Sequence, residues 1–429
     1  MNPSARPLPR RSMLGLGLAA GAGVLTGCSA TSVGTGEGPG SSSAGTAARS
    51  PGSSAVRLVV WADPVRAAAL TAVGRQFGRD HAGATIKVVE KSLADIAAQL
   101  GPAVADGKGP DLAVVGHASL GTLRAAGAVA PMELGDARGR FTPQTVAAFT
   151  ADGQVYGLPC TASTVGLIRN NALSHAAPAT WDEVLSAGSA AKKTYPVMVG
   201  VGPDGDAHRL FGLQSSFGNT AFALTDDGTL GDEVTLGDRA GQAFAGWLAA
   251  QGAKGTKALD TRIGADRAKA QFLDAQAPFW LTGPDDAAEL VRTKLDVAVL
   301  PLPSAGGDPA RPFLDVEGFV LSARSKRALL ATDFCVNYLS SVELQLAASA
   351  GRLPALTAAA EDSAITDDKV LAGFVEVSRG GVPSPALAAM RSVWPLWSGA
   401  EAQVIGGADP DGTWSALAGA VDTALARAG

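Results

Sequence analysis

A glycine-rich loop near the middle of the chain has the spacing of a nucleotide-binding motif, but its residues argue against that use. Residues 200–205 read Gly-Val-Gly-Pro-Asp-Gly, and Asp226 lies roughly twenty residues further on, as a dinucleotide fingerprint requires. Pro203 removes a backbone donor from the loop that would hold a pyrophosphate, and Asp204 adds a repulsive charge there. Asp226 also follows a turn rather than a second strand. We therefore expect no dinucleotide cofactor.

Metal binding and hydrolysis are the other chemistries that these residue types could support. Asp204, Asp206 and His208 alternate along one loop, yet the chain has only four histidines, none at helical ligand spacing, so we expect no metal and no cofactor. Carboxylate pairs that could act as acid and base are plentiful, which keeps a cell-surface hydrolase as an alternative. The chain has no Gly-x-Ser-x-Gly elbow, and Gly116-x-x-Ser119-x-Gly121 has the wrong spacing for one. No acid, base or nucleophile stands out, and we predict a protein that is not an enzyme.

Residues 1–28 predict export and a lipid anchor. Arginines at positions 6, 10 and 11 precede an apolar stretch, Met13 to Leu25, that is too short and too rich in glycine to span a membrane, as in a signal peptide. Leu25-Thr26-Gly27-Cys28 resembles the lipobox of bacterial lipoproteins, in which the cysteine thiol receives a diacylglycerol. Lipidated Cys28 would hold the protein at the extracytoplasmic face of the cell membrane. Arg10-Arg11 also resembles a twin-arginine signal, so the general secretory (Sec) and twin-arginine routes both stay open.

The segment after the cysteine predicts a flexible tether. Residues 29–55 are almost wholly Gly, Ser, Ala, Thr and Pro, so they cannot bury enough apolar surface to offset their ordering entropy. The folded body is expected to begin at Val56. Without the three arginines of the signal, the formal net charge falls from −5 to −8, which makes nucleic acid an improbable partner on charge grounds.

The body is long enough for two domains. At 46% hydrophobic residues it can bury large cores, and no second apolar run is long enough to span a membrane. Two cysteines remain besides Cys28, namely Cys160 and Cys335. They could pair in an oxidising compartment, but we favour two separate buried thiols because they lie far apart in different kinds of segment.

Strand and helix patterns alternate along the body. The first three predicted strands are separated by helical stripes, one with Leu70, Val73 and Phe77, which gives a βαβαβ pattern and a parallel sheet. Four later strands exceed what one α/β lobe would use. The predicted strands span residues 56–61, 85–89, 111–115, 196–201, 279–282, 296–300 and 318–322.

Several short motifs occur in an order that resembles one family. Thr180 and Glu183 form a capping box at the start of an amphipathic helix, within a Pro-x-Thr-Trp-Asp-Glu segment. The motifs are residues 58–61 (Leu-Val-Val-Trp), 109–112 (Gly-Pro-Asp-Leu), 156–159 (Tyr-Gly-Leu-Pro), 166–170 (Gly-Leu-Ile-Arg-Asn), 178–183, 283–284 (Gly-Pro) and 299–301 (Val-Leu-Pro). Together they resemble the maltodextrin-binding family of extracellular solute-binding proteins of sugar ABC importers, over almost everything after residue 56.

The resemblance implies a two-lobe periplasmic-binding-protein fold of the α/β class, type II-like, with the ligand in a cleft between the lobes. Three crossing segments are expected near Ala162, residues 313–317 and residues 364–368. The N-terminal lobe would then comprise residues 56–162 and 317–364, and the C-terminal lobe residues 163–316 and 365–429. A solute that contacts both lobes would stabilise the closed form, which would deliver it to a permease.

Candidate ligand contacts follow from placing the family motifs on this sequence. Trp394 matches a tryptophan that stacks on sugar rings, with core packing as the alternative. For Asp206 and His208 the alternative is a solvated loop, and for His117 a structural role. The expected ligand-binding residues are Asp63, Arg66, His117, Ser163, Asp206, His208, Asp285, Glu317 and Trp394.

The same placement shows what this chain lacks. Only 5% of its residues are aromatic, and the stacking tryptophan and both charged contacts expected near His117 are absent. Sugars present apolar ring faces and many hydroxyl groups, so their binding sites combine flat aromatic side chains with amides and carboxylates. With few aromatics, this chain favours a small or highly polar solute over long maltodextrins, and the expected carbohydrate is an oligosaccharide or disaccharide. We therefore predict a monomeric, membrane-anchored substrate-binding subunit of an ABC importer. A receptor-like or scaffolding lipoprotein without transport stays an alternative.

Overall fold

The computed structural model describes residues 56–225, 229–293, 295–349 and 351–428. The predicted signal with Cys28, the tether over residues 29–55, and Asp226 lie outside these residues. No helix within the described ranges is long and apolar enough to cross a membrane.

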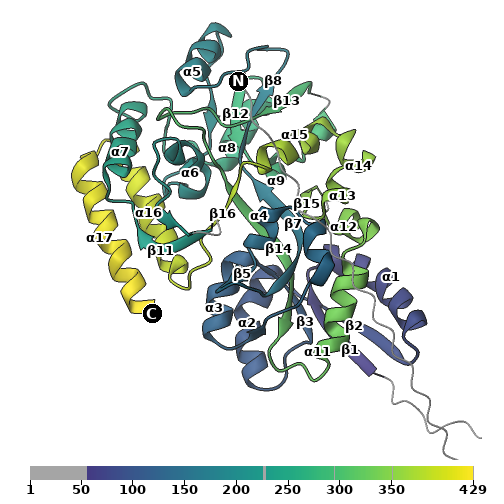
Figure 1. Ribbon diagram of the computed structural model, residues 1–429. Coiled ribbons are helices and arrows are strands. Elements are labelled where there is room, and N and C mark those ends of the chain that lie inside the picture. The colour runs from purple at the N-terminus through teal and green to yellow at the C-terminus, as the bar shows by residue number, and fades with distance from the viewer. Residues whose placement is uncertain (1–55, 226–228, 294, 350, 429) are drawn as a thin grey trace, which may run out of the picture. The chain divides into compact units, whose positions relative to one another are not determined.

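The larger of two main sheets has eight strands and carries the first predicted βαβαβ unit (Figure 1). Its path runs β15-β7-β14-β3-β1-β2, and β4 and β16 also pair with β14. The strands are β1 (Val56–Ala62), β2 (Ala84–Glu90), β3 (Leu112–Gly116), β4 (Val129–Ala130), β7 (Gly157–Thr164), β14 (Phe313–Ser322), β15 (Leu353–Pro354) and β16 (Val382–Pro383). β1 pairs in parallel with both β2 and β3, which confirms the predicted parallel unit.

Helix α1 (Pro64–Asp80) shows why the first unit forms. Asp63 caps it by accepting a hydrogen bond from the Arg66 backbone N–H, and Pro64 occupies its first turn, where a missing N–H costs nothing. Leu70 and Phe77 are fully buried, as the spacing predicts, and the helix packs on β2. Helix α2 (Leu93–Ala105) connects β2 to β3 in the same way.

The second main sheet has four strands in the order β13-β8-β12-β9. They are β8 (Gly166–Asn170), β9 (Met198–Val199), β12 (Phe279–Thr282) and β13 (Val297–Leu300). Helices α5 (Trp181–Ala190), α8 (Ala265–Leu273) and α15 (Lys369–Ser378) belong to this part of the chain, and α15 packs on β13. At α5 the predicted capping box is confirmed, because Thr180 and Glu183 each bond the other's backbone.

Two paired strands connect the two sheets. β7 continues through Val165 into β8 of the second sheet, and β14 runs antiparallel to β7 from Phe313 onward. Their register shifts between Glu317 and Gly318, which marks a β-bulge. The predicted lobe boundaries at residues 162 and 317 fall within these two strands and stay predictions.

Helices and a hairpin complete the second half of the chain. Helices α6 (Ala207–Ser215), α7 (Arg239–Gln251), α16 (Met390–Ile405) and α17 (Pro410–Ala428) pack beside the hairpin of β10 (Phe222–Leu224) and β11 (Leu230–Val234). The remaining elements are α3 (Leu120–Ala125), α4 (Pro143–Ala147), β5 (Thr150–Ala151), β6 (Gln154–Val155), α9 (Pro284–Ala287), α10 (Leu290–Thr293), α11 (Ala328–Asp333), α12 (Val342–Ser349), α13 (Thr357–Ala360) and α14 (Ser363–Thr366), with short helical turns at residues 117–119, 135–140 and 334–339.

Two strand lengths differ from the prediction. The strand predicted over residues 196–201 is reduced to Met198–Val199, because the chain turns into the glycine loop directly after it. The strand predicted over residues 318–322 begins five residues earlier, at Phe313, because that extension pairs with β7.

Both cysteines of the body are buried and free, as favoured from the sequence. Burial raises the pKa of the Cys160 thiol to about 11, although the Arg66 guanidinium opposes this shift. The thiol is therefore neutral at physiological pH.

Candidate ligand-binding site

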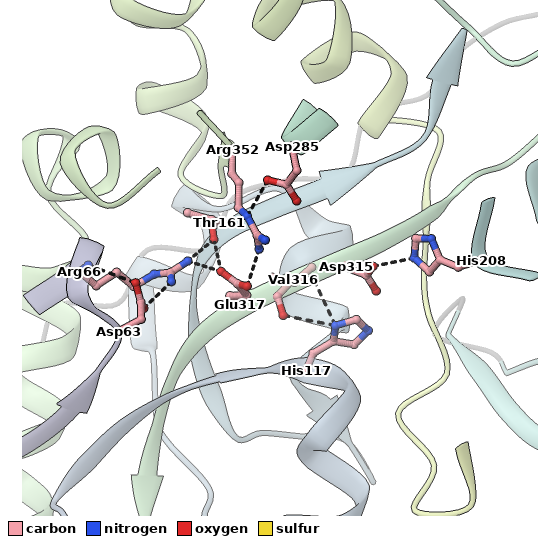
Figure 2. Close-up of polar contacts among 10 residues, drawn as sticks. All are labelled: Asp63, Arg66, His117, Thr161, His208, Asp285, Asp315, Val316, Glu317 and Arg352. Atoms are coloured by element: carbon pink, nitrogen blue, oxygen red, sulfur yellow. Dashed lines mark hydrogen bonds and ion pairs between the residues drawn. The ribbon is translucent and has the colours of Figure 1, made fainter. Parts of the chain in front are cut away.

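A chain of ion pairs gathers four of the expected residues around β14 (Figure 2). Arg66 contacts Asp63 at 2.6 Å and also pairs with one carboxylate oxygen of Glu317. Arg352 pairs with the other oxygen of Glu317 and, through its Nε, lies 3.0 Å from Asp285. Asp63, Arg66, Glu317 and Asp285 thus lie in one continuous network, with Arg352 as the link.

The first part of this network is buried, and its charged groups are paired within the protein. We call Asp63, Arg66, Thr161 and Glu317 the buried cluster, since each is less than a tenth exposed. The Thr161 hydroxyl accepts from Arg66 at 2.6 Å and lies 3.1 Å from Glu317. Charged groups taken out of water need such partners, and each carboxylate here has a guanidinium. These residues therefore support the site more than they face a ligand.

A second group of contacts centres on Asp315, which lies two positions before Glu317 on β14. His208 Nε2 lies 2.6 Å from Asp315 Oδ2, and the Ser384 hydroxyl donates to the other oxygen of Asp315 at 2.7 Å. The side chains of His208 and Asp315 keep 33% and 42% of their exposure. Burial favours neutral forms of both groups, but their mutual attraction outweighs it, so the pKa of His208 is raised and that of Asp315 is lowered. The pair is charged at mildly acidic pH.

Trp394 lies beside this pair. Its ring stacks on Trp397 at 5.6 Å between centroids and an angle of 3°, and lies 6.1 Å from the His208 ring. Unlike Trp397, which is fully buried, Trp394 keeps part of its surface exposed. It lines a cavity of about 180 Å³ opposite Ser119 and Thr122. We call His208, Asp315 and Trp394 the half-exposed cluster.

His117 is buried and has both ring nitrogens engaged. The Val316 backbone N–H donates to its Nδ1 at 3.1 Å, which leaves Nε2 as the donor to the Ser384 carbonyl at 2.9 Å. This imidazole therefore links β3, through the turn after it, to β14 and the segment after β16. The contacts match the structural role that sequence left as the alternative for this histidine. His117 also borders a larger cavity of about 410 Å³, between α3 and the hairpin of β10 and β11.

Asp206 and Ser163 occupy the edges of the region. Asp206 caps α6 by accepting from the Arg209 backbone at 2.9 Å, and its carboxylate also contacts Arg209 Nε at 3.0 Å. Arg209 reaches Asp286, the neighbour of Asp285, at 3.4 Å. Ser163 is partly exposed and lies opposite Asp315 in the pairing of β7 with β14. Asp206 is therefore an ordered cap and not the solvated loop residue of the alternative.

Sequence reasoning missed Thr161, Asp315 and Arg352. Asp315 lies within the predicted crossing at residues 313–317, so the prediction covered its position but not its contact with His208. Thr161 lies one residue before the predicted crossing at Ala162. Arg352 stands alone in a short turn after Gly351, whose φ of 93° favours glycine, and no pattern in the sequence points to it.

The arrangement offers hydrogen-bonding and stacking groups but no catalytic set. Among the described residues, no group of three or more histidine, cysteine or acidic side chains could hold a metal ion. Carboxylates, a guanidinium, an imidazole and an indole face lie close together instead. Such groups suit reversible binding of a polar molecule.

Comparisons with known proteins agree with a binding role. A family model described as bacterial extracellular solute-binding protein matches residues 72–373. The maltodextrin-binding protein MdxE of Bacillus subtilis is 24% identical over 345 residues, which cover 75% of this chain and 78% of that protein. The galactooligosaccharide-binding protein of the same organism is 24% identical over 417 residues, covering 89% and 92%.

A solved structure matches the fold. A cyclo/maltodextrin-binding protein complexed with maltotetraose superimposes with a TM-score of 0.77 at 25% identity, over 87% of this chain and 98% of that one. The predicted two-lobe periplasmic-binding-protein fold is thereby confirmed. The matched proteins are solute-binding proteins rather than enzymes. The match of the family model, which spans more than half of the chain, shows that the chain belongs to the bacterial extracellular solute-binding protein family.

Proposed function

We propose that the protein captures a small carbohydrate between its two lobes and delivers it to the permease of an ABC importer. The observation that carries this proposal is that three consecutive residues of β14 are contacted from different parts of the chain: Asp315 by His208 of α6, Val316 by His117 after β3, and Glu317 by Arg352 before β15. A solute bound there would contact both lobes at the strand that connects them. Its binding energy would then favour the closed form over the open one.

The chemistry of the half-exposed cluster supports a sugar. Asp315 offers carboxylate acceptors, His208 offers a donor, and the exposed part of Trp394 offers an apolar face, which together match the hydroxyl groups and ring face of a pyranose. The maltodextrin-binding and galactooligosaccharide-binding relatives are both 24% identical to this chain, so sequence identity does not indicate which sugar is bound. One tryptophan provides room to stack one ring, which favours a mono-, di- or trisaccharide.

Membrane anchoring and transport are further parts of the proposal, and they rest on the sequence. Lipidation of Cys28 would place the protein at the extracytoplasmic face of the cell membrane, and residues 29–55 would tether the body near its permease. Replacing Cys28 with Ser should release the protein from the membrane fraction into the medium or periplasm. Persistent membrane association of Cys28→Ser would contradict the lipid anchor.

The binding function is tested by titration calorimetry against maltose, maltotriose, galactooligosaccharides and common polyols. We expect at least one sugar to bind with micromolar or tighter affinity and to compact the protein in small-angle X-ray scattering. Substitution Trp394→Ala should weaken that sugar roughly 2- to 12-fold, the value of a specific aromatic contact. Trp247 on α7 is a matched control, because it is also partly buried and stacks on Phe244 away from the polar network. Binding of no sugar, or cleavage of a bound one, would overturn the proposal.

A further inference from the structure

The Arg352–Asp285 ion pair joins the two main sheets. Arg352 directly precedes β15 at the edge of the eight-stranded sheet, whereas Asp285 lies in α9, which follows β12 of the four-stranded sheet. Their contact is 3.0 Å. Every other ion pair found among the described residues joins two residues on the same side of the predicted lobe boundaries.

The two ends of this ion pair are held very differently. Arg352 is fixed by Glu317, which is itself held by Arg66 and Thr161 in the buried cluster. Asp285 keeps 53% of its side-chain exposure and stands on a four-residue helix. Because Glu317 already orients the guanidinium, little further side-chain entropy is lost when Asp285 arrives. This arrangement suits a contact that forms and breaks as the lobes move.

We propose that Arg352 and Asp285 form a clasp that exists only when the lobes are together and that tightens sugar binding by favouring closure. This inference rests on the hinge closure of the proposed function. A contact made in one state and lost in the other shifts the equilibrium between them by its own free energy. The clasp therefore contributes to affinity whether or not either side chain contacts the sugar.

The expected loss of affinity, and its dependence on salt, follow from the solvent exposure of the Arg352–Asp285 ion pair. Half-exposed ion pairs are weak and are screened by salt, so loss of the clasp should weaken binding roughly 1.5- to 5-fold at low ionic strength. The difference should shrink when the salt concentration is raised to about 0.5 M, where the screening length falls to a few Å.

The test uses Asp285→Asn, Arg352→Gln and the double variant in the full chain. Maltotriose is the probe, titrated by calorimetry at low and high salt. Each single variant should bind more weakly at low salt, and the double variant should be no weaker than the weaker single one, because both remove the same contact. Glu376→Gln is the matched control, since it removes the exposed Arg379–Glu376 pair at the C-terminal end of α15. It should leave affinity unchanged.

A second measurement needs no sugar. Small-angle scattering of the ligand-free protein should give a larger radius of gyration for Asp285→Asn than for the wild type at low salt, and equal radii at high salt. If maltotriose fails to bind the wild type but this difference is seen, the sugar assignment is wrong and the clasp stands. Equal radii at both salt concentrations, or unchanged affinity in Asp285→Asn, would overturn the clasp.

Discussion

The buried cluster and the half-exposed cluster each contain one residue of β14, Glu317 and Asp315 respectively, yet they differ in how much of their side chains stays exposed. Arg66 and Glu317 keep 4% and 11% of their side-chain exposure, whereas His208 and Asp315 keep 33% and 42%. In the buried cluster each charge is paired with another and bonded to Thr161 or the backbone. In the half-exposed cluster, parts of the His208, Asp315 and Trp394 side chains still reach solvent.

In the proposed function, this difference separates residues that hold the site together from residues that would contact the ligand. Residues whose polar atoms are satisfied by one another hold the geometry, and adding a ligand to them would cost the bonds they already make. Residues with remaining capacity can exchange water for a sugar hydroxyl at little cost. The following predictions test this division by comparing the loss of stability with the loss of sugar affinity in each variant.

Removing Arg66 should give the largest effect. Arg66→Met leaves Asp63 and Glu317 buried without their shared cation, so we expect the free energy of unfolding to fall by about 3–5 kcal/mol. Urea denaturation followed by tryptophan fluorescence measures this change. Arg75→Met, an exposed position on the same helix, is the control. A loss no larger than that of the control would show that the buried cluster does not hold the fold.

Substitutions of the two stacked tryptophans of α16, Trp394 and Trp397, should differ in the same way in their effects on stability and affinity. Trp397 is fully buried and its indole N–H donates to Gln214 at 3.2 Å, so Trp397→Ala should cost about 3–5 kcal/mol of stability. Trp394→Ala should cost less stability and more sugar affinity, because Trp394 is only partly buried. Urea denaturation and calorimetry on both variants give the comparison. Equal losses of stability would place Trp394 in the core.

Removing the hydroxyl of Thr161 should have a smaller effect. Thr161→Val keeps the shape of the side chain but deprives Arg66 and Glu317 of a shared partner, at a cost of about 1–2 kcal/mol. Thr85→Val on exposed β2 is the control and should change stability little. A thermal unfolding series checks this, and a neutral result for Thr161→Val would mean that the two ion pairs suffice.

The smallest effect should be a pH dependence from His208 and Asp315. The raised pKa of His208 makes its contribution fully present below about pH 6.5 and lost as the pH rises through the raised value. The lowered pKa of Asp315 makes its contribution present above about pH 4 and lost as the pH falls through the lowered value. The pair should therefore stabilise the protein by up to about 1 kcal/mol near pH 5, with the nearby charges of Asp206 and Arg209 partly offsetting each other.

Melting temperatures at pH 5 and pH 9 test this dependence. The wild type should exceed His208→Gln at pH 5, and the difference should vanish at pH 9. His175→Gln is the control because His175 is exposed. A difference that is the same at both pH values would show that His208 acts through packing on Phe313 and Trp394 and not through its charge.

Local patterns predicted much of the fold. The strands at residues 56–61 and 279–282 are short apolar runs bounded by turn residues. The helix cap at Thr180 depends only on the four consecutive residues 180–183. Such features depend on residues that are neighbours in the sequence, so local sequence patterns can predict them. The motif order added the two-lobe arrangement, which local patterns alone did not give.

The site was harder to predict because its contacts are long-range. Arg66 and Glu317 are 251 positions apart, and His117 and Ser384 are 267 apart. Placing motifs named several residues that the structure brings into contact, such as Arg66 and Glu317, but could not show which charges pair with one another. Arg352 was missed for that reason, since its importance comes wholly from Glu317 and Asp285.

The bulge between Glu317 and Gly318 has a mechanical consequence. β7 and β14 cross together as a hydrogen-bonded ribbon, which resists sliding but yields to twisting where its ladder is interrupted. A Cβ at Gly318 would lie 2.5 Å from the Leu158 carbonyl oxygen and 2.8 Å from the Phe149 ring, so only glycine fits at this pivot. If the lobes rotate as proposed, this ribbon would twist at the interrupted pairing, and α9 with its Asp285 would move toward or away from Arg352.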